Sequence, residues 1–308
     1  MHAPPPLKWA GGKRWLVPTL LPLLPPEYGR YHEAFVGGGA LYFGLGPSRA
    51  SLNDLNRDLI DCYEALRDDC EKVISCLWQM RASHEDFLAA RCKKPQNLFQ
   101  RAAWVIYLTT LSFNGLYRVN RDGIFNVPYG HRPPKRGFDV ERLRSAAAVL
   151  RNANLTSTDF AKSLEVCTRG DLVYLDPPYA GSKPGSFVRY EKSFFSWNDQ
   201  KRLAGLAREL AEQGCHVVVS NVDNEEARGL YTQFDALVVE RLTRVAAAKS
   251  ARGSTSELIL ASFELRAAGA DLSIEAQVNG LLGERTLVHQ AEIGSTGVRY
   301  LVPDPSQI

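Results

Sequence analysis

The sequence lacks any long apolar run. No stretch of about 18 or more uncharged apolar residues occurs in the 308 residues, which excludes an ordinary membrane-spanning helix. The opening residues, MHAPPPLKWAGGK, contain no apolar segment of signal-peptide length. We therefore expect a soluble, cytoplasmic protein that has no membrane partner.

Paired cysteines are lacking as well. The chain has six cysteines, but no two of them form a C-x-x-C pair, and none clusters with histidine at a zinc-type spacing. The cysteines are Cys62, Cys70, Cys76, Cys92, Cys167 and Cys215. We expect reduced thiols of an intracellular protein and no bound metal.

An excess of one charge is absent from the chain as a whole, which carries a net charge of +3. Within residues 91–136, however, nine basic residues face a single acid, Asp122, so this window carries +8 and the rest of the chain −5. The basic residues are Arg91, Lys93, Lys94, Arg101, Arg118, Arg121, Arg132, Lys135 and Arg136. Such a segment indicates either contact with a nucleic-acid backbone or a solvated, charge-rich surface.

Short apolar strands alternate with helices along the chain. Four segments predict buried strands: residues 31–36, 50–52, 171–175 and 216–220. Two predict helices, residues 98–111 and 199–213, and Gly214 is a stop signal for the second. This alternation predicts an α/β fold with a mainly parallel sheet.

One segment interrupts the alternation. We predict an inserted, mainly helical domain at residues 61–135, and an α/β domain built from residues 1–60 and 136–265. Residues 266–308 form an extension without recognisable chemistry. Short alternating stretches around Asn279-Gly280 and at residues 298–302 hint at strands there.

A glycine turn follows the first predicted strand. Gly37 to Gly39 let backbone amides approach a ligand, and Asp54, at the end of the next strand, can accept both hydroxyls of a ribose. The turn lacks the spaced third glycine of a dinucleotide site, and a simple helix-capping turn is the alternative. Near the N-terminus, Trp9 can stack on adenine and Lys13 can pair with a carboxylate. This inventory fits S-adenosylmethionine better than a dinucleotide.

The most specific motif is Asp176-Pro177-Pro178-Tyr179, directly after an apolar strand. The exocyclic amino group of adenine is a poor nucleophile, because its lone pair is delocalised into the ring. Two acceptors, the Asp176 carboxylate and the Pro177 carbonyl, can draw it toward a tetrahedral geometry, and the prolines stiffen the loop. Tyr179 can stack on the base. A plain proline-rich turn is the alternative.

Residues 113–130, within the basic window, combine Asn-Gly and Asp-Gly turns with aromatic residues. These turns predict a β-hairpin within the insert. The side chains suit reading of base edges: Asn for adenine, Arg for guanine, Leu for a thymine methyl, and an aromatic ring as a wedge. Packing of the insert alone is the alternative.

Together, in this order, the motifs resemble those of the Dam-type DNA adenine-N6 methyltransferases. The resemblance covers roughly residues 7–265 and extends to Ser220-Asn221 and to the loop at residues 244–257. It implies a Rossmann-like methyltransferase sheet, direct transfer of a methyl group from S-adenosylmethionine without a metal, and a target adenine flipped out of duplex DNA. It assigns cofactor binding to Trp9, Lys13, Phe35, Gly37, Gly39, Asp54 and Asp176, and catalysis to Asp176, Pro177, Pro178 and Tyr179.

The same resemblance assigns the DNA contacts. Phe113 would fill the gap left by the flipped base, and the site itself would be contacted by Asn114, Leu116, Arg118, Asn120, Asn126 and Pro128. Phosphates would be held by Arg91, Lys93, Lys94, Arg132, Lys135 and Arg136. These residue types point to GATC as the sequence that is methylated.

Two alternatives of other classes stay open on the sequence. One is an N-methyltransferase that acts on RNA or on a protein amide, where a planar amino group poses the same chemical problem. The other is a sequence-specific DNA-binding protein without catalysis. A cognate restriction endonuclease is a candidate partner, and a monomer is the expected state.

Overall fold

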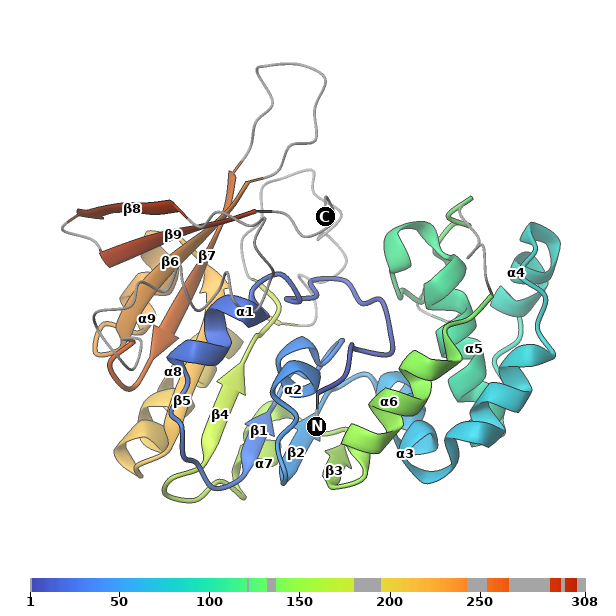
Figure 1. Ribbon diagram of the computed structural model, residues 1–308, viewed down its shortest axis with the longest axis horizontal. Helices are drawn as coiled ribbons and strands as arrows, with labels where there is room; N and C mark the ends of the chain where they lie inside the picture. The colour runs from blue at the N-terminus through green and yellow to red at the C-terminus, as the bar shows by residue number, and fades with distance from the viewer. Residues whose placement is uncertain are drawn as a thin grey trace, which may run out of the picture. The chain divides into compact units, whose positions relative to one another are not determined.

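The computed structural model describes residues 2–120, 122–131, 137–179, 195–242, 254–265, 289–294 and 297–303 (Figure 1). The chain divides into two compact units, each built from two segments. The first unit contains Met1–Arg14 and Glu33–Ser163, and the second contains Trp15–His32 and Leu164–Ile308.

In the first unit, β2 (Ala50–Asn53) pairs in parallel with β3 (Ala153–Thr156). All four residues of β2 are buried, as is typical of a parallel strand covered on both faces. The short helix α2 (Ala40–Leu45) lies between glycines that adopt left-handed backbone angles: Gly39 at its start has φ 63° and Gly46 at its end has φ 59°.

Helices fill the chain between β2 and β3. They are α3 (Arg57–Trp78), α4 (His84–Arg91), α5 (Leu98–Leu111) and α6 (Val140–Leu150). Each begins after a side chain that accepts hydrogen bonds from its first turn: Asn56, Ser83, Asn97 and Asp139, respectively. α3 packs against both α5 and α6 (Figure 1).

The contact between α3 and α5 is apolar, apart from a salt bridge between Arg101 and Asp61. Leu66 of α3 and Leu108 of α5 are fully buried. The carboxylate of Asp61, also buried, accepts from Arg57 at 2.5 Å and from Arg101 at 2.5 Å. Because both oxygens of this acid have cationic partners, its burial is compensated.

A turn-rich segment follows α5. It begins with the 3-10 turn η2 (Phe113–Gly115), in which Asn114 has φ 55°. Two isolated antiparallel bridges, Ser112 with Tyr129 and Val119 with Phe125, then bring the two arms of the segment together. The segment is therefore hairpin-like, as its Asn-Gly and Asp-Gly turns predict.

The second unit carries the longer part of the sheet. Its strand order is β1-β4-β5-β7-β6-β9-β8. The strands are β1 (Tyr31–Glu33), where the chain passes from the second unit to the first, β4 (Leu172–Leu175), β5 (His216–Val222), β6 (Asp235–Leu242), β7 (Ser254–Ala261), β8 (His289–Gly294) and β9 (Gly297–Pro303). β4 and β5 are parallel, whereas β7 runs antiparallel to both β5 and β6.

The remaining helices are short except for one. They are α1 (Val17–Leu20), η1 (Leu21–Leu23), α7 (Phe160–Leu164), α8 (Trp197–Glu212) and α9 (Glu225–Leu230). α8 begins with a capping box between Ser196 and Asp199, and it buries Leu203 and Leu210. No helix in the described parts of the chain is both long and apolar enough to cross a membrane.

The predicted α/β fold with a mainly parallel, Rossmann-like sheet is confirmed. Its details correct the sequence analysis in two places and bear it out in a third. The predicted strand at residues 31–36 ends at Glu33, because the backbone turns toward Gly37. Residues 254–257 of the predicted loop at 244–257 belong to β7, and residues 244–253 lie outside the described residues. The hint of a strand at residues 298–302 corresponds to β9, while Asn279-Gly280 lies outside the described residues.

Candidate functional site

The glycine turn of the first unit is tied to Asp54. The Gly37 N–H donates to Asp54 Oδ2 at 2.9 Å, and the Asn56 N–H donates to Asp54 Oδ1 at 2.9 Å. Burial raises the pKa of this carboxyl, and the two N–H donors oppose that rise. Each carboxylate oxygen can accept a further hydrogen bond, so Asp54 can hold the turn and still accept ribose hydroxyls.

Trp9 covers the same glycine turn. A Cβ atom at Gly37 would lie 3.1 Å from Trp9 Cδ1, and one at Gly38 would lie 3.1 Å from Trp9 Cβ. The indole also stacks on Tyr117, with ring centroids 5.4 Å apart and an interplanar angle of 17°. The missing side chains thus make room for Trp9, and at most one face of the indole is left for an adenine ring.

Two further cofactor candidates, Lys13 and Phe35, lie in the same unit, whereas Asp176 lies in the second. Lys13 is buried, with a relative exposure of 8%. The Phe35 ring contacts Phe160 with centroids 5.4 Å apart. Tyr63 donates to the Gly37 carbonyl at 2.7 Å and so helps to fix the turn. Sequence reasoning did not connect Tyr63, Tyr117 and Phe160 with this turn, because each comes from another segment of the chain.

The Asp176-Pro177-Pro178-Tyr179 tetrad lies in the second unit, directly after β4. The Tyr179 hydroxyl lies 3.4 Å from Asp176 Oδ1 and donates a hydrogen bond to Glu257 Oε1. The same oxygen accepts from Ser220 Oγ at 2.6 Å. A buried glutamate on β7 therefore anchors the last residue of the tetrad.

The middle of the tetrad is held by a second set of contacts. The side chain of Gln200, on α8, donates from Nε2 to the Pro178 carbonyl at 2.9 Å. Its Oε1 accepts from Asn221 Nδ2 at 3.4 Å. Gln200 and Asn221 are both buried. The loop is thus fixed both by its prolines and by neighbouring elements of the sheet and helix layer.

Tyr179 stays protonated in this setting. Burial raises the pKa of its hydroxyl well above 10.0, and the negative charges of Asp176 and Glu257 raise it further. A neutral phenol can donate to Glu257 and keep its ring available for stacking. Sequence reasoning missed Glu257 and Gln200; Glu257 is the single charged residue of the apolar strand β7, which is a usable signal.

The hairpin-like segment uses several predicted DNA-reading side chains for its own structure. Arg118 Nε donates to Asn126 Oδ1 at 2.7 Å. Asn120 Oδ1 accepts from the N–H groups of Asp122 at 3.0 Å and Ile124 at 2.9 Å. Phe113, by contrast, is 49% exposed although it is a large apolar residue. About half of its surface is thus open to a partner, which suits the predicted wedge.

The remaining predicted contact residues lie around this segment. Asn114 and Pro128 are exposed, and Leu116 is half-buried. The Pro128 carbonyl accepts from the Phe113 N–H at 2.9 Å, and the Leu116 carbonyl accepts from Ser112 Oγ at 2.9 Å.

The residues predicted to contact phosphates differ in whether they already have a partner within the protein. Lys93 is exposed, whereas Lys94 pairs with Asp58 at 2.6 Å, and Arg91 Nε donates to the Phe125 carbonyl at 3.3 Å. Lys94 would therefore have to leave its acid to reach DNA. Arg132, Lys135 and Arg136 lie outside the described residues.

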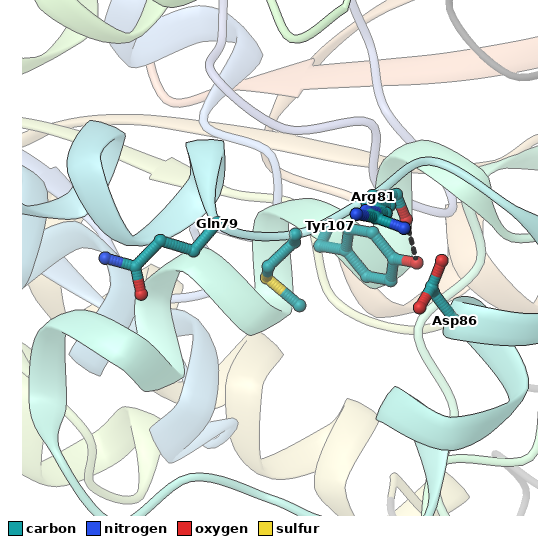
Figure 2. Close-up of a pocket in the computed structure, with 5 residues that line it drawn as sticks. Gln79, Arg81, Asp86 and Tyr107 are labelled. Carbon is teal, nitrogen blue, oxygen red and sulfur yellow. Dashed lines mark hydrogen bonds between the residues drawn. The ribbon is translucent and has the colours of Figure 1, made fainter.

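A small pocket elsewhere on the helices carries no comparable chemistry. It is lined by Gln79, Met80, Arg81, Asp86 and Tyr107. Figure 2 shows the Tyr107 hydroxyl directed at Arg81, whose backbone carbonyl accepts its hydrogen bond at 2.8 Å. Within the described residues, no group of three or more His, Cys, Asp or Glu side chains could hold a metal ion.

Comparisons with known proteins extend these findings. The family model described as D12 class N6 adenine-specific DNA methyltransferase matches residues 9–245. A type II methyltransferase of Lactococcus lactis subsp. cremoris, M1.LlaDCHI, is 37% identical over 267 residues, which cover 83% of this chain and 94% of the relative. The type II methyltransferase M.MjaIII of Methanocaldococcus jannaschii is 34% identical, over 76% of this chain and 90% of the relative. The DNA adenine methylase of Escherichia coli K12 is 31% identical, over 82% of this chain and 93% of the relative.

Proposed function

Because this chain belongs to the D12 class of N6 adenine-specific DNA methyltransferases, we propose that it transfers a methyl group from S-adenosylmethionine to N6 of an adenine that is flipped out of duplex DNA. The observation that carries this proposal is the anchored tetrad: Asp176 and Tyr179 follow β4, and Glu257 and Gln200 hold the loop. The sequence that is methylated is proposed to be GATC.

Residues of the first unit fit the chemistry of the cofactor. Asp54 offers carboxylate oxygens to the ribose hydroxyls, Lys13 offers a cation to the methionine carboxylate, and Phe35 and Trp9 offer aromatic surface to the adenine. When bound, S-adenosylmethionine supplies an electrophilic methyl group on a sulfonium. Gly37 and Gly39 adopt the positive φ angles of the turn that Asp54 and Trp9 contact.

The tetrad prepares the nucleophile. The Asp176 carboxylate and the Pro177 carbonyl accept hydrogen bonds from the two N–H groups of the adenine amino nitrogen. These bonds localise its lone pair, which is otherwise delocalised into the ring, and hold the nitrogen in place. Tyr179 stacks on the base while Glu257 holds its hydroxyl. The nitrogen gains the methyl group as the carbon–sulfur bond of the sulfonium breaks, and it loses one proton, which the Asp176 carboxylate can accept.

The decisive experiment is expression in a host without adenine methylation, followed by single-molecule sequencing that detects N6-methyladenine. Methylation of the adenine of GATC alone is expected, and the DNA should then resist an endonuclease that cleaves only unmethylated GATC. Methylation of another single motif would refute GATC but not the activity. A folded protein that binds duplex DNA and leaves no methylated adenine would refute the activity.

Asp176→Ala tests the proposed mechanism. We expect loss of methyl transfer, since the substitution removes an acceptor for the amino group. S-adenosylmethionine should still bind in calorimetry, although more weakly, because Asp176 is one of several cofactor candidates. Glu212→Gln, which removes a negative charge from the exposed side of α8, is the matched control and should keep full activity. Near-normal transfer by the Asp176 variant would contradict the role of the tetrad.

Substrate and assembly are part of the same proposal. Structured RNA should compete weakly with duplex DNA for binding, and strong competition would favour an RNA substrate. Base flipping predicts a rise in fluorescence when 2-aminopurine replaces the target adenine. We propose a monomer, which light scattering can test, and a cognate restriction endonuclease as a genetic partner.

A further inference from the structure

A second pocket, whose charged lining is entirely cationic, lies in the first unit beside the hairpin-like segment. Its volume is about 210 Å³. It is lined by three cationic side chains, Lys8, Arg14 and Arg142, together with Trp9 and Asn114 among others. None of the residues that line it is acidic. A concave surface with this charge attracts an anion.

Arg142 has a buried hydrogen-bond donor that lacks an acceptor among the described residues. Its Nε donates to the Pro5 carbonyl, which fixes the guanidinium beside the N-terminal segment. Its Nη2 is buried and has no hydrogen-bond partner among the described residues. A buried cationic donor that is left unpaired is costly, and an oxyanion at this position would remove that cost.

The neighbouring cation adds to this effect. Burial lowers the pKa of Arg142, and the positive charge of Arg14 lowers it further, while Asp139 opposes both. A guanidinium nevertheless stays charged at any physiological pH. Two guanidinium groups and an ammonium group that line one small pocket repel one another until an anion separates them.

The pocket adjoins the glycine turn through Gly38 and the hairpin-like segment through Asn114, and the second neighbour bears on which anion it holds. Asn114, which lines it, adjoins Phe113, whose ring is exposed and proposed to enter the DNA stack. Lys8 lies directly against Gly115, where a Cβ atom would come within 2.5 Å of Lys8 Cβ. A duplex that reaches Phe113 therefore carries its backbone past the pocket.

We propose that this pocket binds one phosphate of the DNA backbone through Arg14 and Arg142, with Lys8 at its rim. The contact is independent of sequence and fixes the duplex next to the segment that reads the bases. The proposal rests on the proposed function in taking duplex DNA as the substrate. It adds three residues outside the basic window of residues 91–136.

Salt-dependent binding tests the proposal. Fluorescence anisotropy of a GATC-containing duplex is measured from low to moderate salt for the wild type, Arg14→Gln and Arg142→Gln. Each variant should bind about tenfold more weakly, and its plot of log K against log salt should be shallower by about 0.9, the value for one phosphate. Arg151→Gln, on the exposed end of α6, is the matched control and should change neither quantity.

Two further readouts distinguish a phosphate contact from a contact with a base. The loss should be equal for a scrambled duplex, because a phosphate contact carries no sequence information. In a scan that replaces single phosphates by neutral methylphosphonates, one position should weaken the wild type and leave Arg14→Gln unaffected. Arg14 is exposed and does not hold Pro5, so this variant stays informative if Arg142→Gln folds poorly.

The outcomes are distinct. Unchanged salt slopes in both variants, with normal DNA binding by the wild type, would overturn the phosphate site and leave the proposed function intact. Weaker binding of S-adenosylmethionine with unchanged DNA binding would overturn it in favour of the cofactor's carboxylate as the anion. A wild-type protein that binds no duplex DNA would overturn the phosphate site and the proposed function together.

Discussion

At the scale of single residues, Glu257 anchors Tyr179, the last residue of the tetrad. Its Oε1 accepts hydrogen bonds from both Tyr179 and Ser220, and it is buried with a relative exposure of 7%. A buried carboxylate that accepts from two hydroxyl donors holds both of them in place. In the proposed mechanism Glu257 is therefore a positioning residue that acts on the substrate through Tyr179.

Glu257→Gln should slow methyl transfer without changing cofactor affinity. The amide oxygen can still accept from both hydroxyls, but hydrogen bonds to a neutral acceptor are weaker than those to a carboxylate, at a cost of about 1–3 kcal/mol for the two bonds together. We expect kcat to fall about 10- to 100-fold, with an unchanged Kd for S-adenosylmethionine.

A mutant cycle separates positioning from a merely structural effect. Tyr179→Phe removes the same contact but keeps the ring, so the double variant should be no slower than the worse single variant. Additive losses would show that Glu257 does not act through Tyr179. Because the pKa of Tyr179 is raised well above 10.0, its ionisation should cause no fall in activity between pH 7 and pH 10, for which Tyr179→Phe is the control.

At the scale of elements, the hairpin-like segment orients its proposed base-reading residue. Arg118 Nε donates to Asn126 Oδ1 within the segment at 2.7 Å, and N–H groups of Nη1 and Nη2 can still contact a guanine while this bond holds the side chain. Arg118→Ala should relax the sequence preference by about 1–3 kcal/mol, the value of one bidentate base contact, while binding to a scrambled duplex changes less. Competition binding with single-base variants of the site measures both. An unchanged preference would remove Arg118 from the readout.

A second pair of elements, β1 and β4, is joined at its beginning by His32 and Asp171. His32 Nε2 donates to Asp171 Oδ2 at 2.9 Å, while Nδ1 is buried without a partner among the described residues. Burial lowers the pKa of His32 below 6.5, and Asp171 offsets part of that shift. Burial raises the pKa of Asp171. Hydrogen bonds outweigh this effect and bring the pKa below 3.8; they come from the backbone N–H groups of Arg30 and Thr168 and from the His32 ring.

These shifts predict a loss of stability in acid. The unfolded chain protonates His32 near pH 6.5, whereas the folded chain resists a proton on the buried Nδ1, so acidification below about 6.5 favours unfolding. The stability from Asp171 is present above 3.8 and is lost at still lower pH. Tm should therefore fall between pH 8 and pH 5. In His32→Gln, Tm should start lower and fall less over this range, and an equal fall would contradict the assignment to His32.

Elements and sites differ in how far the sequence determines them. The predicted helix at residues 98–111 is α5 residue for residue, because Asn97 caps its start and apolar residues fill most of its length. The motif after β4 was recognisable because its four residues are adjacent. Glu257 and Gln200 reach the tetrad from β7 and α8, so their role depends on sheet pairing that local patterns do not encode. Tyr117 reaches Trp9 across more than a hundred residues for the same reason.

At the scale of the whole molecule, the sheet continues past the segment that the family model matches. The match ends at residue 245, whereas β9 pairs in parallel with β6, with Leu237 opposite Val298 and Leu242 opposite Pro303. β8 then pairs with β9 in antiparallel orientation. β6 thereby has a hydrogen-bonded neighbour on each side, β7 and β9. The extension beyond residue 265 covers what would otherwise be the edge of the sheet.

Removal of residues 266–308 should therefore reduce colloidal stability more than activity. The truncated chain keeps the tetrad, Glu257 and every cofactor candidate, so kcat per folded molecule should stay within about threefold of the wild type, a difference under 1 kcal/mol. The backbone of β6, freed of β9, becomes an unpaired edge open to other chains, and aggregation should rise with protein concentration. Light scattering and methyl-transfer assays at several concentrations measure both.

A substitution on the freed edge tests the cause of the aggregation. Ala236→Lys, at a half-buried position of β6, should reduce the aggregation of the truncated chain if edge pairing causes it. A truncated chain that stays monomeric at high concentration, or one that folds normally yet loses methyl transfer, would show that the extension serves another purpose than covering β6.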